Sequence, residues 1–355
     1  MFWFDFQFVI AYFILFVFAL VLSNQQDKTH RWLSARNQNY ICWVILLAFG
    51  LIFGLRRYDV GTDTKTYIYI FENVDTYEFG VEFVFKWLVE IIHLIVSTRG
   101  FLLIMALLYV IILGIVIRQN EFSRRNQVLL LLTFATFFFF KNFGFNAIRH
   151  GISAMLLLVA FNSLERRNWT STVLLFLCSI GIHVSSVITI VFYLTARRMK
   201  SLWPSIMLYF FSAMVSLSGH GIKSLASVIT GLVLEDRRAA YFVLEMKYDT
   251  GFRPDFFIFN TAILLTALFV HKKVLINQKE YLVTYRKWIN YFVLSSSIFF
   301  FAFDMPFSDR WGLLSWIVIP YLLEPLFNIN SRYKVSTVYT LVMGALFIVF
   351  ELFII

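Results

Sequence analysis

The chain has 355 residues, of which 60% are hydrophobic and only 15% are charged, and its formal net charge at pH 7 is +10. A soluble domain of this length would need more charge to cover its surface, so the composition excludes an ordinary soluble protein. The positive charge alone would suit a nucleic-acid-binding protein. The basic residues are instead distributed between apolar segments, and this distribution excludes that class.

Apolar runs of about 14 to 20 residues recur along the chain, which is the length that crosses a bilayer. The first run lacks a preceding basic segment and a following small-residue cleavage site, so we interpret it as a span and not as a signal peptide. Cys42 and Cys178 both lie in apolar runs, and they offer neither a disulfide framework nor a thiolate metal site. Spans are predicted near residues 6–22, 40–55, 101–117, 128–140, 147–164, 203–219, 255–270, 288–304, 311–327 and 335–355.

Residues 81–97 form an ambiguous apolar segment that contains four polar side chains. Glu82, Lys86, Glu90 and His93 follow one another at spacings of four, four and three residues. These spacings put all four on one helical face and predict Glu–Lys contacts between residues four apart. We therefore predict an amphipathic helix along the membrane interface and not a crossing.

Residues 169–195 form a second ambiguous segment, and basic clusters flank it on both sides. We predict two short helices that enter the membrane and return, meeting near His183. With both choices, more Lys and Arg fall on the inner side than with the other topologies considered. The sequence thus predicts an all-α polytopic protein with one membrane domain over residues 1–355, about twelve membrane helices and both termini outside. Large outer loops are expected at 56–100 and 220–254, the second with an amphipathic segment at 235–247.

Under this topology, polar residues of the first outer loop face outward. Arg56 and Arg57 end the second span, against the preference for basic residues on the inner side. Lipid-headgroup contact is the alternative explanation for this pair. Asp63 follows in the loop, where it either takes part in chemistry or caps a short helix over 65–72.

Three further outward-facing groups lie later in the chain. Arg149 is about one turn inside an apolar helix, which costs roughly 2.5 kcal/mol or more unless the guanidinium is paired or faces water. Its neighbour His150 is expected to point off this face. His183 is at the tip of the predicted hairpin, where either a functional or an ordinary hydrogen-bonding role is open. Asp309 and Arg310 occupy a short outer connection, with helix capping and interfacial anchoring as the alternatives.

Together these groups predict one outward-facing cavity for a multiply charged anion such as a lipid pyrophosphate. Arginine binds phosphate oxygens bidentately and keeps its charge in a low-dielectric site. A carboxylate or imidazole beside it can take a proton from an attacking hydroxyl. The sequence lacks HExxH, GxSxG, glycine-rich phosphate-loop and Asp-x-Asp motifs, so we expect no metal and no cofactor.

Residues 57–71 resemble the first outer loop of the EpsG family of bacterial polysaccharide polymerases, which are relatives of the Wzy O-antigen polymerases. The pattern is R-x-x-x-G-T/x-D-x-x-x-Y-x-x-x-F, beginning at Arg57 and containing Asp63 and Tyr67. Shorter resemblances follow in the family's order. They are Gly80-Val81-Glu82-Phe83, Asn146-x-x-Arg149, Ile182-His183-Val184-Ser185 and, more loosely, Asp309-Arg310.

This resemblance implies a metal-independent glycosyltransferase that polymerises undecaprenyl-pyrophosphate-linked repeat units into O-antigen or a related surface polysaccharide. It places the reaction on the outer face of the bacterial inner membrane. The expected partners are lipid-linked repeat units, membrane lipids and a chain-length regulator protein, with no nucleic acid. The implied catalytic residues are Asp63, His183 and Arg149, and the implied substrate-binding residues are Arg56, Arg57, Asn146, Asp309, Arg310 and Tyr67. Aromatic side chains expected to stack on sugar rings are Tyr67, Tyr69, Tyr77, Trp87 and Tyr248.

Several rival functions share this architecture. An O-antigen-type ligase would use similar arginines, and a glycosyltransferase with a lipid-phosphosugar donor would want an acidic pair, which Asp59 and Asp63 only half provide. A flippase or transporter of lipid-linked oligosaccharides should show deep basic residues and internal pseudo-symmetry. A membrane O-acyltransferase would present its histidine to a cytoplasmic acyl donor, whereas His183 is predicted near the outer side.

Overall fold

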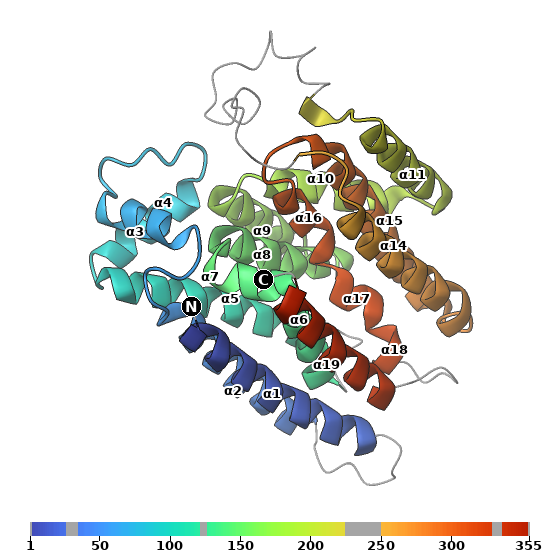
Figure 1. The fold of residues 1–355 in the computed structure, drawn as a ribbon, viewed down its shortest axis with the longest axis horizontal. Coiled ribbons are helices and arrows are strands. Elements are labelled where there is room, and N and C mark those ends of the chain that lie inside the picture. Colours follow the sequence, from blue (N-terminus) through green and yellow to red (C-terminus); the bar gives the residue numbers. More distant parts are fainter. Residues whose placement is uncertain (1, 26–34, 121–125, 224–249, 329–335, 354–355) are drawn as a thin grey trace. The chain divides into compact units, whose positions relative to one another are not determined.

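The computed structural model describes residues 2–25, 35–120, 126–223, 250–328 and 336–353, and in these residues the fold is helical without strands, as predicted (Figure 1). The predicted amphipathic segment 235–247 and Tyr248 lie outside the described residues. The α-helices are α1 (Phe2–Gln25), α2 (Ala35–Gly54), α3 (Thr64–Glu72), α4 (Phe83–His93), α5 (Thr98–Gln119), α6 (Gln127–Thr136), α7 (Phe138–Phe145), α8 (Ile148–Glu165), α9 (Trp169–Ile182), α10 (Ser186–Arg198), α11 (Trp203–Leu217), α14 (Pro254–Phe269), α15 (Lys279–Phe301), α16 (Asp309–Trp316), α17 (Ile319–Leu323), α18 (Pro325–Asn328) and α19 (Ser336–Phe353).

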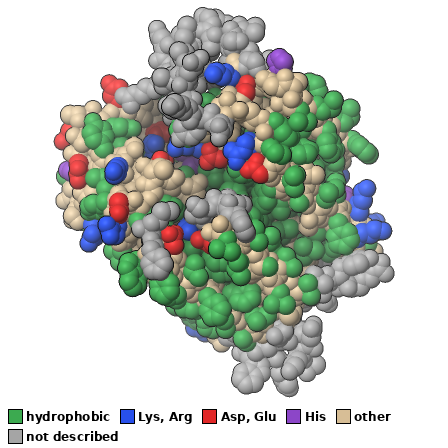
Figure 2. Space-filling model, viewed as in Figure 1, with side chains coloured by type: hydrophobic (Ala, Val, Ile, Leu, Met, Phe, Trp, Pro, Cys, Tyr) green, Lys and Arg blue, Asp and Glu red, His purple; other side chains and the backbone are tan. Residues whose placement is uncertain are grey.

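Four helices of the described chain are long and apolar enough to cross a membrane. They are Trp3–Ser23, Arg36–Gly54, Thr98–Gln119 and Pro254–Val274, and α6 with α7 would make a fifth as one broken span. This number is smaller than the roughly twelve membrane helices predicted. Some apolar runs are divided into shorter helices, whereas α8 and α15 are long enough but not apolar enough to be counted. Hydrophobic side chains still make up much of the surface in view (Figure 2). The chain is a multi-pass membrane protein.

The predicted span 128–140 consists of two helices, α6 and α7. The chain bends by 80° between α6 and α7, at Phe137, whose backbone is extended. The hydroxyls of Thr133 and Thr136 donate to the carbonyl oxygens of Leu129 and Leu132, and such back-bonding favours helix bending. The predicted span 311–327 is also divided, into α16, α17 and α18.

The described chain divides into two compact units, and the first contains Met1–Ile190 and Glu324–Ile355. Within it, α2 packs closely on α5, since a Cβ at Gly50 or Gly54 would meet α5 side chains at less than 3.0 Å. The terminal helices α1 and α19 pack together, and the ring of Tyr12 stacks on Phe347 at a centroid distance of 3.5 Å. The short helices α3 and α4 both pack against α5.

A buried ion cluster joins three helices inside this first unit. Nζ of Lys141 on α7 lies 3.0 Å from Asp5 on α1 and 2.8 Å from Glu351 on α19. Only 3% of the Lys141 side chain is exposed. A lysine in an apolar region needs such carboxylate partners to remain charged.

The second unit, Val191–Leu323, is built around α15. α11 and α16 pack along this helix. Aromatic rings of Phe256, Phe299 and Trp316 fill the space between α14, α15 and α16, with centroid distances of 5.3 to 5.4 Å. A hydrogen bond of 2.6 Å from Ser205 Oγ to Asn290 Oδ1 ties α11 to α15.

Candidate functional site

The loop between α2 and α3 is held against the junction of α7 and α8 by Asn146. Its Oδ1 accepts hydrogen bonds of 2.9 Å from Thr62 Oγ1 and from the backbone N–H of Asp63. Gly61 has φ +87° and approaches Phe145 so closely that a Cβ there would lie 2.7 Å from the ring. Only glycine fits this combination of backbone and space. The structure therefore brings together two predicted site residues, Asp63 and Asn146.

Asp63 stands at the N-cap position of α3, where the sequence allowed either capping or chemistry. Its side chain makes no capping hydrogen bond to the helix. Instead, Asp63 Oδ1 accepts a hydrogen bond of 3.2 Å from the hydroxyl of Thr62. Asp63 is half-buried. Helix capping therefore does not explain why an aspartate occupies this position.

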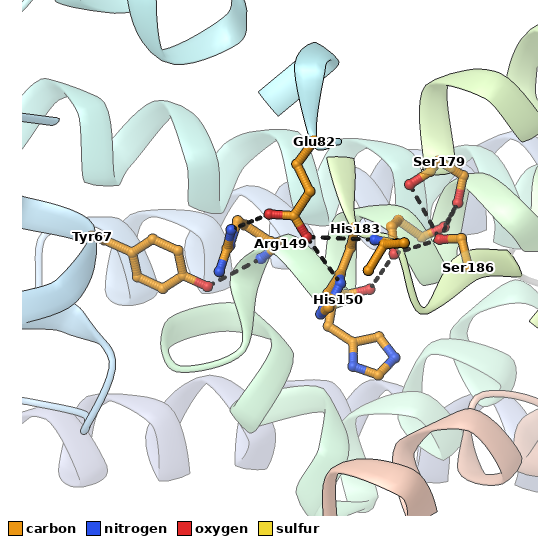
Figure 3. Close-up of polar contacts among 9 residues, drawn as sticks. Tyr67, Glu82, Arg149, His150, Ser179, His183 and Ser186 are labelled. Atoms are coloured by element: carbon orange, nitrogen blue, oxygen red, sulfur yellow. Dashed lines mark hydrogen bonds and ion pairs between the residues drawn. The ribbon is translucent and has the colours of Figure 1, made fainter. Parts of the chain in front are cut away.

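A chain of three charged or ionisable side chains runs across the centre of the site (Figure 3). Nη1 of Arg149, in the first turn of α8, lies 2.5 Å from Oε2 of Glu82. The second carboxylate oxygen, Oε1, lies 3.5 Å from Nδ1 of His183 and accepts a hydrogen bond of 3.5 Å from the backbone N–H of Val184. Glu82 thus connects the predicted catalytic residues Arg149 and His183.

Arg149 is enclosed by aromatic side chains in addition to its carboxylate. Its guanidinium carbon lies 5.0 Å from the ring centre of Phe85 and 5.9 Å from that of Tyr67, distances at which cation–π attraction operates. The backbone N–H of Arg149 donates to Oη of Tyr67 at 3.3 Å. Burial raises the pKa of Tyr67, so this hydroxyl stays protonated at neutral pH. About a quarter of the Arg149 side chain, 24%, is exposed and accessible to a ligand.

His183 occupies the break between α9 and α10, as the sequence predicted for the meeting point of two short helices. Serine side chains hold this turn onto α8: Ser179 Oγ donates to the Ser153 carbonyl at 3.0 Å, and the hydroxyls of Ser179 and Ser186 are 2.8 Å apart. Gly181 lets α9 approach the start of α4, because a Cβ there would overlap Val84. That approach brings His183 beside Glu82. The re-entrant path of this segment stays a prediction.

His150 was expected to point away from Arg149, and its ring packs against His183. Its ring is buried, and it packs edge-on against His183 with a centroid distance of 5.1 Å at an interplanar angle of 75°. On its other side it contacts Phe143, at 5.4 Å. His150 therefore forms part of the wall behind His183.

The two consecutive arginines after α2 have different environments: Arg56 is buried and Arg57 is exposed. Arg56 is 3% exposed, and it donates to the carbonyl of Phe53 at 2.5 Å and to Thr64 Oγ1 at 3.1 Å. Burial lowers the pKa of Arg56 to about 10, so the group remains charged at neutral pH. Arg57 is exposed and forms a two-point contact with Asp59, at 3.1 Å to each carboxylate oxygen. Their expected contact with substrate stays a prediction.

The predicted residues Asp309 and Arg310 belong to the second unit. Both are exposed, in the first turn of α16, for which Ser308 and not Asp309 is the N-cap residue. The Arg310 guanidinium lies 5.0 Å from the ring centre of Phe307. Their part in the same site as Arg149 also stays a prediction.

Glu82 is the site residue that the sequence did not single out. The predicted helical face would pair Lys86 with both Glu82 and Glu90; the side-chain contact with Glu90 is confirmed, and the side-chain contact with Glu82 is wrong. Glu82 precedes α4 and turns to Arg149, while Lys86 pairs with Glu90 at 3.6 Å. Two features of the sequence indicate Glu82. It lies in the segment Gly80-Val81-Glu82-Phe83 that resembles a family motif, and Arg149, in an apolar helix, requires a carboxylate partner.

No group of three His, Cys, Asp or Glu side chains in the described part of the chain is arranged to hold a metal ion. The charged groups of the site are instead an arginine, a carboxylate and an imidazole. Such a set can bind a phosphate anion and move one proton.

The fold and this site define a class: a multi-pass helical membrane protein with an arginine–carboxylate–histidine site. The family model of the EpsG family matches residues 39–355, and the chain belongs to this family. Membership points to a polysaccharide-polymerase type of glycosyltransferase. Neither the curated proteins nor the solved structures contain a significant match to the chain.

Proposed function

We propose that the protein polymerises undecaprenyl-pyrophosphate-linked oligosaccharide repeat units into O-antigen or a related surface polysaccharide, on the outer face of the bacterial inner membrane. The observation that carries this proposal is the Arg149–Glu82–His183 chain, with contacts of 2.5 and 3.5 Å. Residues of separate family motifs meet there, beside the Asp63 loop.

In the proposed reaction, a sugar hydroxyl of one lipid-linked repeat unit attacks the anomeric carbon of the growing chain on a second lipid. A new carbon–oxygen bond forms, and the bond between the anomeric carbon and the pyrophosphate oxygen breaks. The departing lipid pyrophosphate takes the electron pair of the broken bond. The hydroxyl proton passes to a base on the protein. Atoms and charge balance without a metal or cofactor.

Arg149 supplies the positive charge that the leaving group needs. Preorganised donors stabilise a developing charge best in a site that excludes water, and Phe85 and Tyr67 enclose this guanidinium. Arg56, Arg57, Asp309 and Arg310 are proposed to bind the remaining phosphate and sugar groups. Exposed Tyr69 and Trp87 offer rings on which sugars can stack.

Two residues are candidates for the base. The backbone of Asp63 is held by Asn146, whose Oδ1 accepts from its N–H at 2.9 Å, and the Asp63 carboxylate accepts from Thr62 at 3.2 Å. The His183 imidazole contacts the Glu82 carboxylate that also neutralises Arg149. Substitution of each residue separately distinguishes them, since only loss of the true base abolishes turnover without weakening substrate binding.

Expression in a host that lacks its own polymerase tests the proposal. A ladder of glycan lengths on a gel requires a polymerase, whereas a single repeat unit on the lipid would contradict the proposal. Arg149→Ala and Asp63→Ala should collapse the ladder while the protein still inserts. Normal ladders in both variants would contradict the proposed site. Transfer of finished chains to another acceptor would favour a ligase, and translocation without bond formation would favour a flippase.

A further inference from the structure

The two oxygens of the Glu82 carboxylate serve two different partners. Oε2 accepts from Arg149 at 2.5 Å, and Oε1 faces the imidazole Nδ1 of His183 at 3.5 Å. The first contact has the length of a strong charge-assisted hydrogen bond, whereas the second is too long for a good one. In this arrangement the Glu82 carboxylate therefore binds Arg149 more closely than His183.

This pairing conflicts with the use of Arg149 as a pyrophosphate ligand. A guanidinium neutralised by a carboxylate offers less charge and fewer free N–H donors to an incoming anion. A pyrophosphate group carries more negative charge than one carboxylate, and it presents several oxygens in the geometry that arginine binds bidentately. It can therefore displace Glu82 from Arg149, as long as the released carboxylate finds another partner.

We propose that Glu82 is a positioning residue that substrate binding transfers from Arg149 to His183. This inference rests on the proposed function. When pyrophosphate takes the guanidinium of Arg149, the Glu82 carboxylate moves onto Nδ1 of His183. A carboxylate in that position fixes the tautomer with hydrogen on Nδ1 and stabilises the imidazolium that forms when Nε2 accepts a proton.

The transfer couples base activation to the presence of donor substrate. The acceptor hydroxyl gives its proton to Nε2 of His183 only when a pyrophosphate occupies Arg149. Without that anion, Glu82 stays on Arg149, and its contact with the imidazole Nδ1 stays at 3.5 Å. The movement is small, because the Glu82 carboxylate already lies 2.5 Å from Arg149 and 3.5 Å from His183.

The local structure keeps Glu82 within reach of both partners. Glu82 ends the loop before α4, and Phe85 on the first turn of that helix is fully buried against Arg149. The close packing of Gly181 on Val84 fixes the start of α4 against the His183 turn. A rotation of the Glu82 side chain is therefore enough, with no movement of a helix.

Binding and turnover of Glu82→Gln test the proposal in nanodiscs with undecaprenyl pyrophosphate as the probe. The amide keeps the size of the side chain but removes the competing charge. We expect the Kd for the probe to stay equal or fall several-fold, while kcat for repeat-unit transfer falls by at least about tenfold. If Glu82 merely held Arg149 in place, Glu82→Gln would bind the probe more weakly, and that result would overturn the proposal.

Three controls accompany this measurement. Glu90→Gln makes the same chemical change on α4, at an exposed carboxylate paired with Lys86, and should keep wild-type Kd and kcat. Glu82→Asp keeps the charge and should recover part of the lost kcat. Undecaprenol, which lacks phosphate, should not bind. If Glu82→Gln is not monodisperse, His183→Gln replaces it in the same assays. An unchanged Kd with lost turnover supports the proposal. Loss of probe binding, as expected for Arg149→Ala, overturns it.

The Kd measurement with undecaprenyl pyrophosphate tests this inference separately from the proposed function. A wild-type protein that forms no polymer contradicts the polymerase assignment. In that case the displacement of Glu82 by pyrophosphate is judged from Kd alone: equal or tighter binding by Glu82→Gln supports it, and weaker binding overturns it. A wild-type protein that polymerises, with a Glu82→Gln variant of unchanged kcat, contradicts the transfer to His183 and leaves the polymerase assignment intact.

Discussion

Glu82 Oε2 lies 2.5 Å from Nη1 of Arg149, although 67 residues separate the two positions in the sequence. The pairing joins the loop before α4 to the first turn of α8. It explains how an arginine is tolerated in an otherwise apolar helix, because the carboxylate offsets the cost of removing its charge from water. The same carboxylate links this arginine to His183, so one side chain organises the proposed site.

Asn146→Ala should reduce activity by up to about thirty-fold. The substitution removes two hydrogen bonds of 2.9 Å, to Thr62 and to Asp63. Each contributes about 1 kcal/mol, and a loss of about 2 kcal/mol in the transition state slows the reaction by about thirty-fold. Initial rates of glycan elongation measure it. Asn73→Ala, which removes a hydrogen bond of 2.9 Å at the end of α3, is the control and should leave the rate unchanged. An equal loss in both variants would show that Asn146 has no special role.

Gly181→Ala should impair turnover without altering the amount of protein in the membrane. The new methyl group would overlap the Val84 side chain and push the His183 turn away from Glu82. The second substitution Val84→Ala removes the methyl groups that the new side chain would meet. The double variant should therefore recover part of the activity. The new Cβ would still lie 3.0 Å from Cβ of residue 84, so full recovery is not expected. Absence of any rescue would mean that the contact between α9 and α4 does not position the site.

Lys141→Met should destabilise the first unit, because it leaves Asp5 and Glu351 without their shared cation. Breaking a buried ion pair costs roughly 3–5 kcal/mol, and we expect the low end or less, since 31% of the Asp5 side chain is exposed. Thermal unfolding in detergent measures the loss as a lower Tm. Lys86→Met removes an ion pair whose lysine is 48% exposed and should barely change the Tm. Equal Tm values for both variants would contradict a structural role for the Lys141 cluster.

Activity should survive treatment with EDTA. Pyrophosphate is already a good leaving group, and Arg149 provides the charge that a divalent ion would otherwise supply. Elongation rates before and after chelation, followed by re-addition of Mg²⁺, measure this. A loss with EDTA that Mg²⁺ reverses would contradict metal-independent chemistry.

The sequence predicted the features that depend on local pattern. Hydropathy predicted an all-helical membrane protein, and the polar break at His183 was located correctly between α9 and α10. The position of Asp63 before a short helix was also correct. These features follow from residues close together in the chain, so periodicity and motifs are enough to find them.

Features that depend on tertiary packing were not predicted. Averaged hydropathy does not register the bend at Phe137 or the break between α16 and α17 at Ile317 and Val318, since the residues at these breaks are as apolar as their neighbours. The helical face proposed for Glu82 failed because its partner Arg149 lies on another helix. The burial of Arg56 against the end of α2 and Thr64 was not predicted either, and its contact with substrate stays a prediction.

The most direct test of the proposed function is elongation by the purified protein in liposomes that contain only lipid-linked repeat units. The wild-type protein should produce a ladder of undecaprenyl-pyrophosphate-linked chains, and Arg149→Ala should produce none. Arg99→Ala, an arginine that packs on Tyr58 outside the site at 5.7 Å, should give the wild-type ladder. Wild-type protein that leaves every lipid with a single repeat unit, or an Arg149→Ala ladder equal to the wild type, would contradict the account.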